Sequence, residues 1–133
     1  MKNTKGEVSS KLKISVSRKE GRIRIGNGVI KVLGNPEYIC IYVFTYTDAL
    51  MVRPCEKKEF LSIKVTKNDN VIPKNDLRVN SLQFVSELYF KNGWNTNGTY
   101  QMQGVYNESL NATVFYYKNA VLMQHNKDSI SKI

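Results

Sequence analysis

Residues 22–36 read RIRIGNGVIKVLGNP, and this run contains most of a small folding unit. An alternating basic strand is followed by a short apolar helix, and a Gly-Asn-Pro break ends the helix. Two further apolar runs complete the unit by residue 53. The same order recurs over residues 77–117, with Arg78 in the place of Arg24 and an Asn ahead of each helix. One repetition of this length indicates an internal duplication rather than a repeat array.

The predicted fold class is therefore α+β and mainly β. We expect a small barrel built from two pseudo-repeated βαββ halves, residues 12–66 and 77–123, which share one core. A chain of 133 residues that is 41% hydrophobic and has eight Tyr and five Phe is large enough to bury such a core as one domain. Residues 12–123 form that domain, and the polar stretches 1–11 and 124–133 are expected to be mobile tails.

Residues 12–25 alternate apolar and polar side chains, which is typical of two half-exposed strands joined by a turn. The apolar positions are expected to face the core, and they are Ile14, Val16, Ile23 and Ile25. The basic positions are expected to face water or to lie at the turn, and they are Lys13, Arg18, Lys19, Arg22 and Arg24. These five residues are the candidate nucleic-acid-binding site.

Other apolar patterns predict the rest of the core. Residues 38–44 are uniformly apolar, which predicts a central strand buried on both faces. Residues 81–90 have a helical apolar period and a cap at Asn80 or Ser81, whereas Asn27 is expected to cap the first helix. The predicted joint core contains Ile39, Ile41, Val43, Leu82, Val85 and Leu88. The run Phe115-Tyr116-Tyr117 fits either a stacking platform for bases or alternating core positions.

The charge is concentrated near the N-terminus. Residues 1–66 carry thirteen Lys and Arg against six acids, and residues 67–133 carry seven against five, which together give the net charge of +9. Residues 1–24 alone have eight bases and two acids. Such clustering is typical of a protein that binds a polyanion, although a solvated basic surface has the same composition.

The sequence offers no catalytic constellation. It lacks a Gly-rich phosphate loop and a nucleophile elbow, its one histidine is His125, and its eleven acids are scattered singly. We therefore expect no enzyme, no cofactor and no metal site. Cys40 and Cys55 are expected to be two reduced thiols rather than a disulfide or zinc ligands. Without a secretory leader or a run of 18 apolar residues, a cytoplasmic location away from membranes is expected.

Two resemblances are carried by particular motifs. Residues 22–25, 29–34 and 50–54 together resemble the swapped-hairpin barrels of AbrB/MraZ-type bacterial transcription regulators, which implies DNA binding. The chain has Gly26 where those regulators usually carry Pro, and it lacks the Asp of their Gly-Asp turn. The run Leu33-Gly34-Asn35-Pro36 is similar to the signature of an uncharacterised group of small bacterial proteins often carried by phages and other mobile elements. The second resemblance implies no function.

Two functional hypotheses follow, from different classes. In the first, the chain is a small basic DNA-binding regulator of bacterial or mobile-element origin. In the second, it is a mobile-element interaction protein that inhibits a host factor such as a CRISPR nuclease. The expected partners are thus a nucleic acid or a host protein, with a second copy of the chain as a third candidate. Retention on nucleic acid that weakens with salt favours the first hypothesis.

Overall fold

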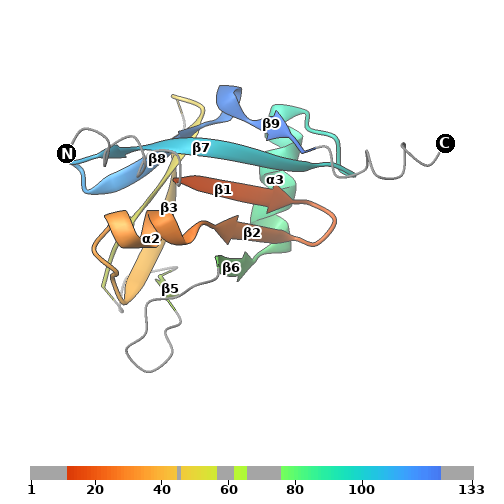
Figure 1. The fold of residues 1–133 in the computed structure, drawn as a ribbon. Helices are drawn as coiled ribbons and strands as arrows, with labels where there is room; N and C mark the ends of the chain where they lie inside the picture. Colours follow the sequence, from red (N-terminus) through yellow and green to blue (C-terminus); the bar gives the residue numbers. More distant parts are fainter. Residues whose placement is uncertain (1–11, 45, 57–61, 66–75, 124–133) are drawn as a thin grey trace.

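A computed structural model describes residues 12–44, 46–56, 62–65 and 76–123. The described part is mostly β, and its strands form a nearly closed antiparallel sheet that resembles a barrel (Figure 1). The predicted tails 1–11 and 124–133, and residues 67–75 between the two predicted halves, lie outside the described residues. The elements are β1 (Lys13–Ser17), β2 (Arg22–Ile25), α2 (Asn27–Val32), β3 (Tyr38–Phe44), β4 (Ala49–Pro54), β5 (Ile63–Lys64), β6 (Leu77–Asn80), α3 (Leu82–Asn92), β7 (Thr99–Asn107), β8 (Ala112–Tyr116), η1 (Tyr117–Asn119) and β9 (Val121–Leu122).

The strands follow one another in the order β5-β3-β4-β8-β7-β1-β2-β6, and β9 also pairs with β7. The long strand β7 joins the two parts of the sheet, because its first half pairs with β1 and its second half pairs with β8. Element order is the same in two segments: β2, α2, β3 and β4 in the first, and β6, α3, β7 and β8 in the second. The helices α2 and α3 lie toward opposite ends of the β1–β2 hairpin (Figure 1).

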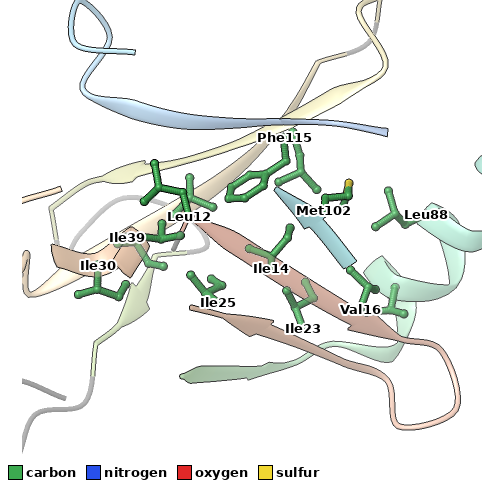
Figure 2. Packing of buried hydrophobic residues seen from close by; sticks show 14 of the residues in the cluster. Leu12, Ile14, Val16, Ile23, Ile25, Ile30, Ile39, Leu88, Met102 and Phe115 are labelled. Atoms are coloured by element: carbon green, nitrogen blue, oxygen red, sulfur yellow. The ribbon is translucent and has the colours of Figure 1, made fainter. Parts of the chain in front are cut away.

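The predicted hairpin over residues 12–25 is confirmed. Its strands β1 and β2 pair in the register Ile14–Ile25 and Val16–Ile23, and all four apolar side chains are at most 2% exposed. They point into the barrel toward Met102 of β7 and other buried apolar residues (Figure 2). Because successive strand residues point to opposite faces, the basic residues between them are held on the outside.

The predicted burial is wrong for two of the six core residues, Val43 and Leu82. Val43 is 45% exposed, because it lies near the end of β3, beyond the two residues of that strand that pair with β5. Leu82 is 56% exposed, because α3 begins next to the β1–β2 turn, where the Ser81 amide donates to the Gly21 carbonyl oxygen, 2.9 Å away. Leu82 thus lies outside the core, although Val85 in the same helical turn is buried. Ile39, Val85 and Leu88 are buried as predicted, whereas Ile41 is only half-buried and packs against the core.

The burial predicted for residues 38–44 is also only partly right, since Tyr42 is 37% exposed. Its strand pairs with β4 from Ile39 to Phe44 but with β5 only at Tyr38 and Ile39. A strand with neighbours on both edges along its whole length would be covered more completely.

The helix caps match the sequence at one helix and differ at the other. Ser81 caps α3, accepting a hydrogen bond from the Phe84 amide, and Gly93 ends that helix in the left-handed conformation at φ 64°. The N-cap of α2 is Gly26 rather than Asn27, and it makes no side-chain capping bond. The α2 exit does use the expected glycine, since Gly34 has φ 89°, which a residue with a side chain rarely adopts.

Candidate nucleic-acid interface

Four neighbouring strands, β6, β2, β1 and β7, present a polar outer surface opposite the core. Their registers align outward-facing residues in two rows across the sheet. One row is Arg78, Arg24, Ser15 and Gln101, and the other is Asn80, Arg22, Ser17 and Thr99. The surface therefore combines cations on β2 and β6 with neutral hydrogen-bonding groups on β1 and β7.

A groove of about 390 Å³ follows this surface. Its lining includes both serines of β1, Thr99 and Gln101, and the basic residues Lys13, Arg22 and Arg24. Two acids, Glu20 and Asp76, also line it. We define the basic face as Lys13, Arg22, Arg24 and Arg78, the four cations carried by β1, β2 and β6 on their outer side.

The side chain of Arg22 is held by two neighbours. Its Nε donates to Asn80 Oδ1 over 3.1 Å, and its guanidinium lies 3.7 Å from the Glu20 carboxylate. The ion pair is partly solvated, with the Arg22 side chain 28% exposed and that of Glu20 50% exposed, so it contributes little to stability. Its effect is to fix where the guanidinium points.

Arg24 and Arg78, unlike Arg22, lie beside another cation. They are directly opposite each other in the β2–β6 pair, and both are exposed. Side chains in such positions share a face, with Cβ atoms about 4.5–5.5 Å apart. Within the part of the chain that the structure describes, ion pairs link Arg22 to Glu20 and Lys91 to Asp48, and neither Arg24 nor Arg78 has one. Like charges placed this way repel, and an anion between them would relieve the repulsion.

The structure brings three of the five sequence-predicted residues together, namely Lys13, Arg22 and Arg24. The other two, Arg18 and Lys19, lie in the β1–β2 turn, outside the paired strands that carry the basic face. Arg78 was missed as a site residue, although its match to Arg24 in the repeated element order was a usable signal. Asn80, Thr99 and Gln101 were missed as well, because only the strand pairing shows that they share this surface.

The aromatic run at residues 115–117 does not form the stacking platform considered from the sequence. Phe115 is fully buried and Tyr117 is 4% exposed, which leaves only Tyr116 at the surface. A base needs an accessible ring face, so the interpretation as alternating core positions is the correct one. Tyr117 instead contacts Trp94 edge to face, with 6.4 Å between ring centroids.

A buried tyrosine fixes the end of the polar surface. Tyr89 of α3 directs its hydroxyl group to the carbonyl oxygens of Val16 and Gly98, at 2.8 and 2.7 Å. Val16 lies in β1 and Gly98 precedes β7, so this side chain ties together the two strands that carry Ser17 and Thr99. Burial raises the pKa of Tyr89, which extends to higher pH the range in which its hydroxyl is neutral and can donate.

Other kinds of site receive no support from the described residues. No group of three or more His, Cys, Asp or Glu lies close enough among them to hold a metal ion. In the same ranges, no helix has both the length and the apolarity needed to cross a membrane. No protein-family model matches the chain, and no curated protein or solved structure matches it either.

Proposed function

We propose that this chain is a small nucleic-acid-binding protein whose basic face contacts the phosphate backbone. The observation that supports it most is the Arg24–Arg78 pair, two exposed cations held side by side by strand register. Guanidinium groups bind phosphate oxygens bidentately, so two adjacent arginines suit a ligand with closely spaced phosphates.

The surroundings of the pair fit the same ligand. Ser15 and Ser17 of β1 pair with Arg24 and Arg22, and Gln101 of β7 follows beyond Ser15; all three can donate to phosphate or sugar oxygens. Such contacts position a nucleic acid without reading its sequence. A regulatory role on DNA is the finer form of the proposal, and it is supported by the resemblance to AbrB/MraZ-type regulators.

We also propose that the barrel consists of two βαββ halves descended from one. The strand order supports this: exchanging β2, β3 and β4 for β6, β7 and β8 turns the β3–β4 pair into the β7–β8 pair and maps the β2–β6 and β4–β8 pairs onto themselves. The pairing of Arg24 with Arg78 supports it too, because residues at equivalent positions pair with each other across a two-fold axis.

The proposal is tested by fluorescence anisotropy of labelled duplex DNA, single-stranded DNA and duplex RNA with the purified chain over a range of salt concentrations. The logarithm of the binding constant should fall linearly with the logarithm of salt concentration, with a slope of roughly −3 for three to four phosphate contacts. Absence of binding to all three probes at about 50 mM salt would rule the function out.

A protein-binding role is the second candidate, and one observation favours it. The outer surface across β3, β4, β8 and β7 carries an apolar row. The row consists of Tyr42, Met51, Val114 and Val105. Its two ends are exposed, Tyr42 at 37% and Val105 at 62%, whereas Met51 and Val114 between them are buried. A host factor bound there would be retained independently of salt and of nuclease treatment, which distinguishes the two candidates.

A further inference from the structure

The two cysteines of the chain lie together. Cys40 of β3 is directly opposite Arg53 of β4, and the Cys55 amide donates to the Tyr38 carbonyl oxygen at 3.0 Å, one step past the end of β4. Cys55 and Arg53 are two residues apart, so both cysteines belong to the same face of the hairpin. Their sulfur atoms are in contact, with 2.7 Å between Cys40 Sγ and Cys55 Sγ.

We propose that Cys40 and Cys55 form a modification site, which a low-molecular-weight disulfide converts into an intramolecular disulfide. The inference does not depend on nucleic-acid binding, because neither cysteine belongs to the basic face. It rests on strand register, which puts both side chains on one face of the hairpin as diagonal neighbours, and on the contact between the two sulfur atoms.

The order of reaction follows from burial. Cys40 is 3% exposed whereas Cys55 is half-buried, so a small oxidant reaches the Cys55 sulfur first. The Cys55 thiolate attacks one sulfur of the oxidant RSSR, which forms a mixed disulfide and releases one thiolate, RS⁻. The Cys40 thiolate then attacks the Cys55 sulfur and releases the second RS⁻. In total the two cysteines lose two electrons and two protons, and the oxidant becomes two RSH.

The bond would tie the middle of β3 to the end of β4. The bond closes a loop of about 15 residues, from Cys40 to Cys55, and so restricts the unfolded chain. The resulting rise in the thermal midpoint should be roughly 5–15 °C. A cross-link that strained the native hairpin would give no rise.

The test incubates the purified full chain with oxidised glutathione and measures intact mass, followed by peptide mapping without reductant. The wild-type chain should lose two hydrogen atoms, keep no glutathione, and yield a linked pair of peptides containing Cys40 and Cys55. Cys40→Ser should instead retain one glutathione on Cys55, and Cys55→Ser should react far more slowly. Circular dichroism of both variants checks that they are folded.

Three results would overturn the proposal. The first is a wild-type chain that remains a dithiol while Cys40→Ser takes up glutathione. The second is a stable glutathione adduct or an intermolecular dimer of the wild type. The third is an oxidised wild type whose thermal midpoint is no higher than that of the reduced chain.

Discussion

Arg24 and Arg78 face each other across the antiparallel pair β2–β6, with Ile23 and Val79 as the adjacent pair that points inward. The inward pair joins the barrel core, since Ile23 is 2% exposed and Val79 packs against it. The core thus fixes the register, and the register forces two cations together on the outside. A sheet selected only for stability would place an acid opposite one of them.

The first prediction concerns the stability of the ligand-free chain. Arg24→Gln should raise the free energy of unfolding by roughly 0.2–1 kcal/mol at low salt, because it removes the repulsion from Arg78. The gain should disappear near 1 M salt, where the Debye length is about 3 Å. Urea unfolding at both salt concentrations measures it. Lys31→Gln, the same charge change on the exposed surface of α2, is the control, and an equal gain from it would contradict the assignment.

A second prediction separates the buried face of α3 from its exposed start. Leu88→Ala should cost about 2–5 kcal/mol of unfolding free energy, because Leu88 is 4% exposed within the core. Leu82→Ala on the same helix should cost less than about 1 kcal/mol, since that side chain is 56% exposed. Chemical denaturation of the two variants gives both values, and similar losses would show that α3 is packed differently.

Removing the hydroxyl group should lower the free energy of unfolding at Tyr89 but not at Tyr117. Tyr89→Phe removes the hydrogen bonds to Val16 and Gly98 and should cost about 0.5–1.5 kcal/mol. The Tyr117 hydroxyl is buried and has no hydrogen-bond partner among the described residues, so Tyr117→Phe should leave stability unchanged or raise it. Urea midpoints at pH 7 test both, and a destabilised Tyr117→Phe would mean that its hydroxyl is paired.

Alkaline pH provides a further test of Tyr117. Burial, followed by the nearby Asp48 charge, raises its pKa from 10.0 to about 12. Between these two values the unfolded chain releases this proton and the folded chain keeps it, so stability must fall as pH rises from about 10 to 12. Thermal midpoints across this range should decline less steeply in Tyr117→Phe. Superimposable pH profiles for the variant and the wild type would contradict the raised pKa.

The sequence predicted where strands and helices lie better than it predicted which of their apolar side chains are buried. Alternation in residues 12–25 identified two strands and their inward side chains, because a period of two is a local property that strand pairing does not alter. The uniform apolarity of residues 38–44 and the helical period of residues 81–90 placed Val43 and Leu82 in the core, and both predictions were wrong. Whether an apolar residue near the end of a strand or helix is covered depends on where neighbouring elements stop, and no local pattern contains that information.

In the candidate site, too, the sequence predicted what depends on one hairpin and missed what depends on pairing between distant strands. Lys13, Arg22 and Arg24 could be predicted to face outward together, since they share one hairpin and one alternation. Arg78 lies 54 positions beyond Arg24, and only the β2–β6 register shows that the two are neighbours. The contact between Cys40 and Cys55 was likewise hidden, because it depends on the β3–β4 pairing continuing past Pro54.

The most direct measurement compares two charge-matched double variants in anisotropy titrations with labelled duplex DNA, single-stranded DNA and duplex RNA. Arg24→Gln with Arg78→Gln removes two cations from the basic face, whereas Lys31→Gln with Lys118→Gln removes two exposed cations outside it. On the strongest-binding probe, the first pair should weaken binding roughly ten- to a hundredfold at about 50 mM salt and flatten the salt slope by about two. The second pair should remain close to wild type. Equal losses in both variants, or no binding by the wild type, would contradict a nucleic-acid interface on β2 and β6.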